Sequence, residues 1–202
     1  FSRYVIRCVR YGGDTVSSPI IDKADIDGTL DEQINQTHNF IMRNISTKAE
    51  LVGSKSVEKY SYPEEAIREI VANAVVHRDY QITETYTQVN VFSNRIEVSN
   101  AGNLPPGISI ENIKDAQFSR NEIIAATLKD MGYMEEYGRG IDLVYSRMRE
   151  WGLLKPIFKN KANSFKVILL GEQFKILNAS QVLIWQFLQD EEKVTAVRCM
   201  EL

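Results

Sequence analysis

Three hydrogen-bonding side chains recur every four residues in the stretch EAIREIVANAVVHRDY, which covers residues 65–80. Glu69, Asn73 and His77 would lie along one edge of a helix, because side chains four positions apart are stacked one above the other. An amide oxygen is a ligand that a hard cation accepts, and a carboxylate one helical turn away could orient or deprotonate a water. The alternative is that Asn73 and His77 are polar residues at a helix boundary and that Glu69 is solvated.

Two glycine-containing turns follow this helix in the sequence. The first is NAGNLPPG at residues 100–107, and the second is GRG at residues 138–140, directly before an amphipathic stretch. A glycine turn that opens a helix presents free backbone N–H groups and the positive end of the helix dipole, and so favours a phosphate. Asn73 would then hold a cation that bridges phosphates, and Glu69 would prepare a water for attack on a terminal phosphoryl group. These residues point to a nucleotide site.

The elements that must position these residues follow from hydrophobic periodicity, capping signals and turn residues. The patterns predict helices at 29–43, from Pro63, at 121–131, from 138–140 and at 177–188, and strands at 1–12, within 86–99 as a hairpin, and at 164–170. The polar segment 44–61 is expected to be extended. Together these elements predict an α+β fold, in which an antiparallel or mixed sheet has its helices packed on one face.

Composition limits the kinds of protein that this chain could be. With 202 residues, 44% of them hydrophobic and 25% charged, it has the balance of a soluble globular protein of one or two domains. No apolar run approaches the roughly 20 residues that span a bilayer, so no membrane segment is expected. Cys8 and Cys199 are too few for a disulfide framework, which favours reduced thiols in a cytoplasm. With a net charge of −3, any binding to nucleic acid must come from a local patch.

Several motifs suggest activities that the rest of the sequence does not support. His77, Arg78 and Asp79 spell the catalytic-loop triplet of protein kinases, but the sequence lacks the glycine-rich loop, strand lysine and DFG of a kinase. It also lacks a GxxxxGK[ST] loop, so strand-separating motor activity is not expected. His38 and His77 have no cysteine or acidic partner at ligand spacing, which argues against zinc. The arginines at positions 3, 7 and 10 could form a basic strip, although a solvated strand face is the commoner cause.

The order of the parts resembles that of the GHKL ATPases, the superfamily of gyrase, the ninety-kilodalton heat-shock chaperones and the histidine kinases. ExxxNAxxH, NxG and GxG follow one another as the three boxes of that superfamily do. More specifically, the chain is similar to the RecG-related, GHKL-like C-terminal domain in YPEEAIREIVANAVVHRDY, NRIEVSNAGNLPPGI and FSRNEIIAATLKDMGYMEEYGRGIDLVYSRM. That domain occurs in bacterial and archaeal transcriptional regulators, often named helicase-related, that carry an N-terminal Schlafen-AlbA domain. The resemblance implies a GHKL (Bergerat-type) α/β sandwich.

The resemblance also divides the chain into parts. Residues 1–12 are similar to the last strand of a Schlafen-AlbA-like unit, residues 13–170 to the GHKL-like domain, and residues 171–202 to a linker and the truncated start of a winged-helix unit. The chain would then be a piece of a longer protein, with DNA bound through the flanking domains. Because GHKL relatives often dimerise, the resemblance is also compatible with a homodimer.

The family's functional residues can be carried over one by one. Glu69 matches the water-activating glutamate, and Asn73 matches the magnesium-binding asparagine. Gly102 matches the first glycine box, and Gly138 and Gly140 match the second. The resemblance therefore implies ATP and magnesium as cofactors.

Three further residues are expected to touch the nucleotide. Arg120 lies in the segment that folds over nucleotide in the superfamily and could reach a phosphate, the alternative being a surface ion pair. His77 could contact a phosphate or the lid, the alternative being a hydrogen-bonded boundary histidine. Asn100 stands where the superfamily has an aspartate that accepts a hydrogen bond from the adenine amino group. Its carbonyl oxygen can still accept that bond, as an uncharged acceptor, and its NH2 could suit a different base edge.

Two functions of different kinds follow from these residues. The first is a nucleotide-binding domain of a DNA-linked transcriptional regulator, which hydrolyses ATP weakly or uses it as a switch and closes a lid over residues 103–137. The second is a non-hydrolysing scaffold or dimerisation module that connects DNA-binding domains. Glu69 and Asn73 favour the first function, whereas Asn100 and the loosened first glycine box favour the second.

Overall fold

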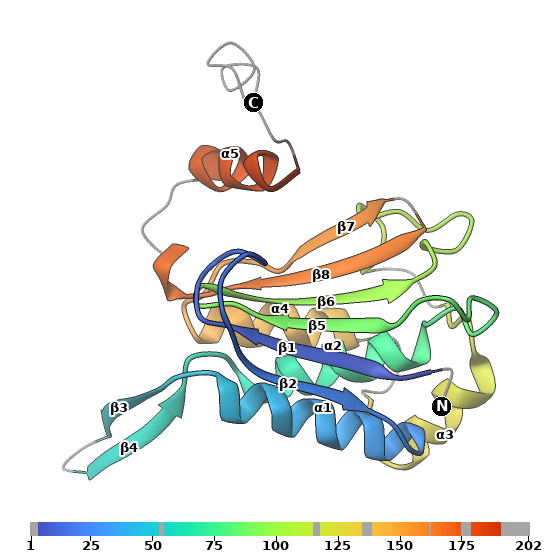
Figure 1. The fold of residues 1–202 in the computed structure, drawn as a ribbon, viewed down its shortest axis with the longest axis horizontal. Coiled ribbons are helices and arrows are strands. Elements are labelled where there is room, and N and C mark those ends of the chain that lie inside the picture. Colours follow the sequence, from blue (N-terminus) through green and yellow to red (C-terminus); the bar gives the residue numbers. More distant parts are fainter. Residues whose placement is uncertain are drawn as a thin grey trace.

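Figure 1 shows the fold of the computed structural model, which describes residues 4–52, 55–114, 118–134, 139–161, 163–174 and 179–190. The strands are β1 (Ile6–Tyr11), β2 (Ile20–Ile26), β3 (Thr47–Val52), β4 (Lys55–Tyr60), β5 (Thr87–Val91), β6 (Arg95–Ala101), β7 (Ile157–Lys161) and β8 (Ser164–Leu170). The helices are α1 (Leu30–Asn44), α2 (Glu64–Val76), α3 (Glu122–Asp130), α4 (Gly140–Glu150) and α5 (Ala179–Asp190), with a short 3₁₀ turn, η2 (Glu172–Phe174).

Six strands form the main sheet, in the order β2-β1-β5-β6-β8-β7. β1 and β5 run parallel, whereas the other neighbouring strands run antiparallel. Parallel neighbours need a long crossover, and here the chain between β1 and β5 contributes β2, α1, the β3–β4 pair and α2. The sheet is therefore mixed, which is one of the two forms that the sequence predicts.

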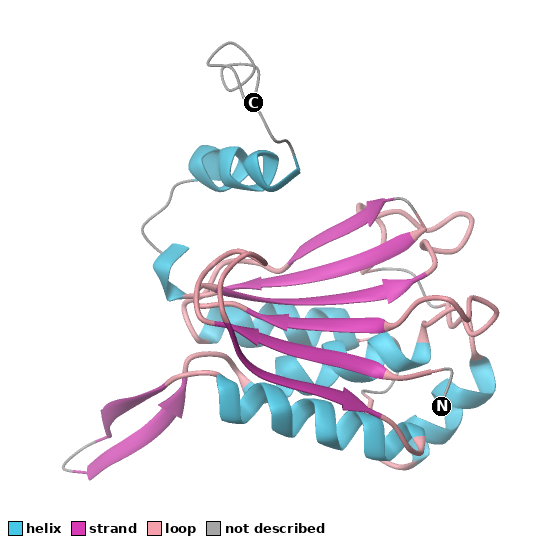
Figure 2. Cartoon of the chain, viewed as in Figure 1, coloured by secondary structure: helices cyan, strands magenta, loops and turns pink. Residues whose placement is uncertain are grey.

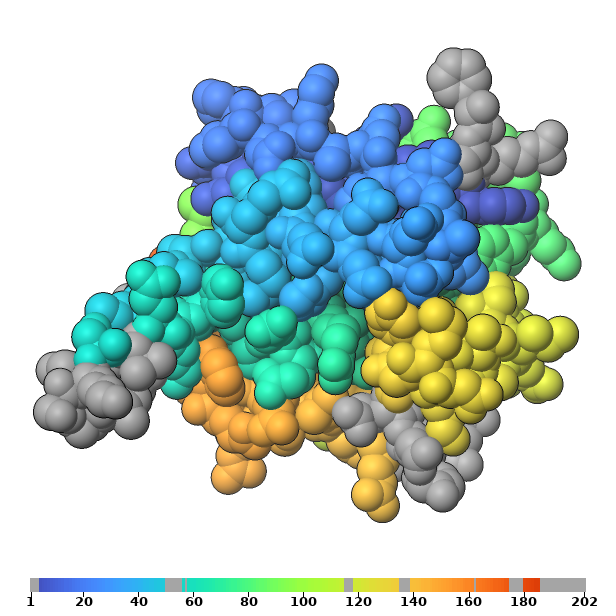
Figure 3. Space-filling view, turned by 90° about the horizontal axis from the view of Figure 1, so that it is seen from below, coloured from blue at the N-terminus to red at the C-terminus, as the bar shows by residue number. Residues whose placement is uncertain are grey.

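The helices α1, α2 and α4 cover one face of this sheet. In Figure 2 they lie behind the strands, and the view from below in Figure 3 shows α2 between α1 and α4. Val89, Val98 and Leu169 of three different strands point into this layer and belong to one buried core with residues of these helices. Because successive side chains on a strand alternate between the faces, their neighbours point to the opposite face.

Local sequence signals set several helix ends. The backbone N–H of Thr29 donates to Glu32 Oε2 at 2.9 Å, in the capping box expected before α1. Pro63 is the N-cap of α2, so the helical residues begin at Glu64, one position later than expected. α3 ends shortly before Gly132, whose φ of 78° suits a glycine at a helix C-terminus.

The periodicity misses two strands of the main sheet. β2 exposes both Ile20 and Ile21, so it lacks a clear alternation of apolar and polar residues. β7 is an edge strand with the polar sequence IFKNK. The segment 44–61 is extended, as predicted, but its strands β3 and β4 pair with each other and project from the main body (Figure 1).

The two ends of the described chain pack against the main sheet. β1 lies between β2 and β5, so the expected division after residue 12 falls between two paired strands of one sheet. After β8, Phe174 contacts Trp185 of α5 with ring centroids 4.7 Å apart. Both rings pack with Ile168 and Leu170, which point to the face of the sheet opposite the core helices. The winged-helix assignment of residues 171–202 stays a prediction.

Two expectations from composition concern the described residues only in part. No helix in the described part of the chain is long and apolar enough to cross a membrane. Cys8 is a free thiol in the core, where burial raises its pKa to about 12, so it is protonated at neutral pH. Cys199 lies outside the described residues.

Candidate functional site

A cavity of about 340 Å³ lies between α2, the sheet and the segment that leads into α4. Seven of the eight residues predicted at the site line this cavity: Glu69, Asn73, His77, Asn100, Gly102, Arg120 and Gly140. They come from α2, the end of β6, the residues before α3, and the start of α4. The eighth, Gly138, lies outside the described residues. The structure therefore brings together residues that are far apart in the sequence.

Glu69, Asn73 and Gly140 form a close polar group at one side of the cavity. Asn73 Nδ2 donates to Glu69 Oε1 at 2.9 Å, which is the i,i+4 contact that the spacing predicts. Gly140 is the first residue of α4, and a Cβ atom at this position would overlap the Glu69 carboxylate, only 2.6 Å from its Cδ. Glycine at 140 therefore lets the positive N-terminal end of α4 lie directly against a negative side chain.

The alternative of a solvated Glu69 is wrong, because this residue is only 3% exposed. On a helical wheel it lies nearly opposite the apolar arc of Ile67, Ile70, Val71 and Ala74, but α2 lies between α1 and α4 and is buried on most of its surface. A buried carboxylate is costly unless it is hydrogen-bonded or close to a positive charge. The amide of Asn73 and the N-terminus of α4 supply these partners.

The C-terminal end of α2 is completed by side chains from later segments. The last carbonyl groups of a helix have no partners within the helix. The side chains of Asn100, Tyr80 and Asn121 donate to three of these carbonyls, at Ala74 O (2.5 Å), Val75 O (2.9 Å) and Val76 O (2.7 Å) respectively. This end of α2 is therefore fixed to β6 and to the start of α3, which are the elements that surround the cavity.

A buried chain of hydrogen bonds orients the amide of Asn100, which is 7% exposed. Arg78 can only donate, and its Nη1 donates to Thr87 Oγ1 at 3.0 Å. The Thr87 hydroxyl therefore donates onward to Asn100 Oδ1 at 2.8 Å, and the Asn100 NH2 faces Ala74 O. Asn100 keeps the remaining lone pair of its carbonyl oxygen and the second N–H of its amide, because the bond to Ala74 O uses only one of the two N–H groups.

Arg120 borders another side of the cavity. Its Nη1 donates to Asp79 Oδ2 at 2.9 Å, and its Nη2 donates to Asn103 O at 2.5 Å. The ion pair considered for Arg120 is therefore present, although both side chains are half-buried. In the described part of the chain Arg120 Nε has no hydrogen-bond partner. Gly102, with a φ of 93°, lets the end of β6 approach this pair, because a Cβ there would lie 2.8 Å from Asp79 Cβ.

His77 lies half-buried at the cavity, one turn beyond Asn73. Burial, with the positive charge of Arg120 acting in the same direction, lowers the pKa of His77 to about 4. At neutral pH the imidazole is uncharged. It can therefore donate or accept a hydrogen bond at the cavity, but it offers no positive charge to a phosphate.

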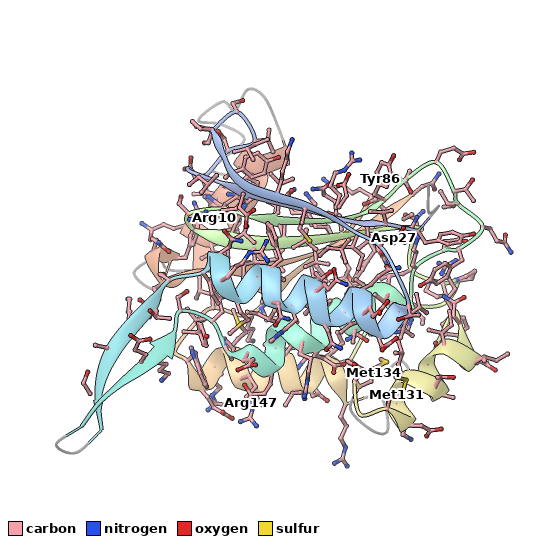
Figure 4. The ribbon with its side chains drawn as sticks, turned by 60° about the horizontal axis from the view of Figure 1, so that its bottom comes forward. Arg10, Asp27, Tyr86, Met131, Met134 and Arg147 are labelled. Carbon is pink, nitrogen blue, oxygen red and sulfur yellow. The ribbon has the colours of Figure 1, made fainter. Side chains whose placement is uncertain are left out.

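Apolar side chains form most of the cavity wall. The sheet contributes Val98, Phe165 and Val167, and the segment from residue 104 to 134 contributes Leu104, Pro105, Ile113, Phe118 and Met134. Figure 4 labels Met134 close to the end of α3. The sequence reasoning did not single out Lys129 and Ser119, which also line the cavity. Their position in the predicted lid was the signal that could have found them.

The donors at the site fit a cation that arrives together with phosphates. Asn73 uses its NH2 toward Glu69, which leaves its Oδ1 as an oxygen ligand at the cavity. No group of three or more His, Cys, Asp or Glu that could hold a metal occurs among the residues that the structure describes. Magnesium usually takes one or two protein oxygens, phosphate oxygens and waters. One amide oxygen beside a carboxylate suits that mode better than a permanent metal site.

The fold is similar to a solved structure, the crystal structure of the DIP2311 protein from Corynebacterium diphtheriae. The TM-score is 0.76 at 18% sequence identity, over 93% of this chain and 42% of that chain. The chain thus spans less than half the length of DIP2311. At this identity the likeness shows the α+β fold with its mixed sheet. A comparison with curated proteins gives no match.

Residues 84–169 match a family model described as "Putative ATP-dependent DNA helicase recG C-terminal". The matched segment contains Asn100, Gly102, Arg120 and Gly140, and it begins after α2, the helix that carries Glu69 and Asn73. This is the family that the order of the sequence motifs indicates. Over these residues, which are less than half of the chain, the sequence is similar to the RecG C-terminal family of ATPase-like domains.

Proposed function

We propose that this chain binds ATP together with magnesium in the cavity beside α2, as the nucleotide-responsive part of a DNA-linked transcriptional regulator. The observation that supports this proposal most is the convergence of seven predicted residues, from four parts of the chain, on one cavity. The proposal includes the finer assignment of the fold as a GHKL (Bergerat-type) sandwich. DNA contacts through flanking domains, a winged helix after residue 170 and a homodimer belong to the same proposal.

The charges of the cavity suggest how a nucleotide would lie in it. The N-terminus of α4 at Gly140 and the amide oxygen of Asn73 favour phosphates and their cation. The apolar wall formed by Val98, Phe165 and Val167 suits the flat base. Asn100 Oδ1 would accept a hydrogen bond from an exocyclic amino group through the lone pair that the Thr87 hydroxyl leaves free.

Weak hydrolysis would depend on Glu69. Asn73 and the start of α4 hold its carboxylate in place, so Glu69 could accept a proton from a water near the terminal phosphate. Asn73 would contribute its oxygen to magnesium, which when bound neutralises charge on the phosphates. Arg120 would exchange its bond to Asn103 O for a phosphate oxygen while it keeps Asp79.

The second candidate function is a scaffold without turnover. Asn100 caps α2, and Arg120 is held by Asp79 and Asn103, so these two residues have structural roles that need no nucleotide. On this alternative the cavity would be a remnant of the ATPase-like family, and the chain would only connect DNA-binding units.

Titration with a fluorescent ATP analogue in the presence of magnesium separates the two functions. We expect saturable binding that falls at least tenfold in Asn73→Ala, because the change removes the cation ligand and the partner of Glu69. Asn39→Ala, an exposed amide on α1, is the matched control and should bind as the wild type does. Glu69→Gln should keep binding but lose phosphate release.

The results that would overturn the proposal are equally specific. Absence of saturable binding at millimolar analogue, in a protein whose thermal unfolding is normal, would leave the scaffold function. Equal losses in Asn73→Ala and Asn39→Ala would show that the binding does not use this cavity. Unchanged phosphate release in Glu69→Gln would remove the hydrolytic role of Glu69.

A further inference from the structure

A second hollow, of about 410 Å³, lies on the opposite face of the sheet from the nucleotide cavity. Its floor is formed by residues of β6 and β8, its one side by the turn between β1 and β2, and its other side by the edge strand β7. This face is turned toward the viewer in Figure 1, with α2 and α4 behind it. The lining residues are Thr15, Val16, Phe92, Arg95, Glu97, Lys159, Lys161, Ser164, Lys166 and Ile168.

Three charged side chains on the floor of the hollow form a compact cluster. Arg95 Nε donates to Glu97 Oε1 at 2.6 Å, and Lys166 Nζ donates to Glu97 Oε2 at 2.7 Å. Burial of Glu97 opposes its ionisation, but the bonds and charges of Lys166 and Arg95 prevail and lower its pKa. The carboxylate is therefore ionised at neutral pH, and the cluster carries one net positive charge.

Arg95 has donor capacity that the protein does not use. The residue is 4% exposed, its guanidinium lies over the Phe92 ring at 3.9 Å, and its Nη1 donates to Asp14 O and Asn94 Oδ1. Its Nη2 makes no hydrogen bond with any residue that the structure describes. Arg95 Nη2 is not among the buried atoms that lack a partner, so it is open to the hollow and can donate to an acceptor there.

Lysines on β7 add positive charge beside this cluster. Lys159 stands directly opposite Lys166 on the neighbouring strand, and like charges in that position are unfavourable for a sheet. Lys161 lies two residues further along β7, on the same face as Lys159. The hollow thus has four basic residues and one acidic residue in a chain whose net charge is −3. Its positive charge is a local feature of the fold.

A polar row leads from the hollow across the sheet. The strand register aligns Lys159, Lys166, Ser99, Gln88 and Arg7 on five adjacent strands. With neighbouring strands about 4.8 Å apart, the row is about 19 Å long, which is too long for one phosphate and suits an extended chain of phosphates. Hydroxyl, amide and basic side chains are the groups that contact phosphate oxygens in complexes with nucleic acids.

We propose that this face of the sheet binds a single-stranded nucleic acid by its phosphate backbone, with one phosphate held in the hollow at Arg95 and Lys166. The site is separate from the nucleotide cavity, because the two lie on opposite faces of the sheet. Ser164 and Thr15 supply hydroxyl donors at the same phosphate, and Lys159 and Lys161 contact its neighbours along the strand. The single strand is the occupant that we propose, because one row of polar side chains crosses the sheet and can follow one phosphate backbone.

Fluorescence anisotropy with a labelled 20-nucleotide single strand of DNA tests this proposal. With about three phosphates neutralised, affinity should fall about 20-fold between 50 and 200 mM salt, because each contact contributes about −0.7 to the slope of log K against log salt. The double variant Lys159→Gln, Lys161→Gln removes two of these contacts, so the magnitude of the slope should decrease by about 1.4. Lys48→Gln with Lys59→Gln makes the same charge change on the projecting β3–β4 pair and should leave the slope unchanged.

Four results would overturn the proposal. The first is that the single strand does not bind at 50 mM salt, and the second is that both double variants change the salt slope equally. The third is that a duplex of the same length binds more tightly than the single strand. The fourth is that polyglutamate of matched charge displaces the labelled strand as well as unlabelled DNA does. The Lys159/Lys161 variant should bind the ATP analogue with wild-type affinity. The nucleotide cavity and the sheet face can therefore fail independently.

Discussion

Replacing Gly140 with alanine should destabilise the fold through Glu69. In an ordinary helix this substitution stabilises by about 1 kcal/mol, because alanine loses less backbone entropy. Here the new Cβ would occupy the space of the Glu69 carboxylate, so that side chain must move. Glu69 would lose the hydrogen bond from Asn73, and a bond to a charged group is worth about 1.5–3 kcal/mol. The expected net loss is about 0.5–2 kcal/mol, or about 1–8 °C in Tm for a domain of this size.

Thermal and urea unfolding of four proteins would measure this coupling. They are the wild type, Gly140→Ala, Glu69→Ala and the double variant. If the two residues compete for the same space, Gly140→Ala should stabilise the Glu69→Ala background by about 1 kcal/mol, which gives an interaction energy of about 1.5–3 kcal/mol. Gly132→Ala has nothing within 4 Å of its added Cβ but lies at φ +78°, so it measures the cost of a backbone strain that Gly140, without a positive φ, does not have. A Gly140→Ala protein as stable as the wild type would refute the reasoning.

Three further predictions concern the buried polar groups around the cavity. Asn100→Asp replaces the amide donor to Ala74 O with a carboxylate oxygen, so two acceptors would face each other. The free energy of unfolding, measured with urea at pH 7, should fall by about 1–3 kcal/mol. The exposed Asn39→Asp should show no such fall. Burial should raise the pKa of the new carboxyl, so this deficit should shrink as the pH falls toward 4; a constant deficit would argue against it. NMR titration of His77 should give a midpoint near 4, and Arg120→Gln should raise it, because the Arg120 charge disfavours the imidazolium. The His77 imidazole of the unfolded chain then binds a proton at a higher pH than that of the folded chain. As the pH falls from about 6.5 to 4, the free energy of unfolding should therefore drop by up to about 3 kcal/mol. The drop should be smaller in His77→Gln, which has no imidazole to protonate. Thr87→Val should leave Arg78 Nη1 without its acceptor and cost about 1–3 kcal/mol in the same unfolding assay, whereas Thr127→Val on exposed α3 should cost less than 0.5.

Short-range patterns predicted the local geometry of the residues around the cavity. The i,i+4 spacing gave the contact between Glu69 and Asn73, and glycine before an amphipathic stretch gave the start of α4 at Gly140. Which side of α2 would be covered could not be read from the sequence, because it depends on where α4 packs, some 70 residues later in the chain. The sequence therefore left a solvated Glu69 open as an alternative, and the structure excludes it because the residue is buried.

Long-range pairing explains most of the remaining differences. Asn100 was recognised by its place in a motif, but its bond to Ala74 O joins residues 26 positions apart and left no local signal. β2 and β7 were missed because an exposed strand and an edge strand need not alternate between apolar and polar residues. The basic hollow was also invisible in the sequence, because Arg95 and the lysines of β7 meet only through the strand register.

The way in which α2 ends has a consequence for how the chain assembles during synthesis. Its last carbonyl groups accept hydrogen bonds from the side chains of residues 80, 100 and 121. A nascent chain that has left the ribosome only as far as β5 lacks two of these donors, so the final turn of its helix is frayed. Completion of the helix, and with it the alignment of Asn73 and His77, comes only when residue 121 has left the ribosome. Truncations before that point should yield a loosened, protease-sensitive α2, even though every residue of the helix is present.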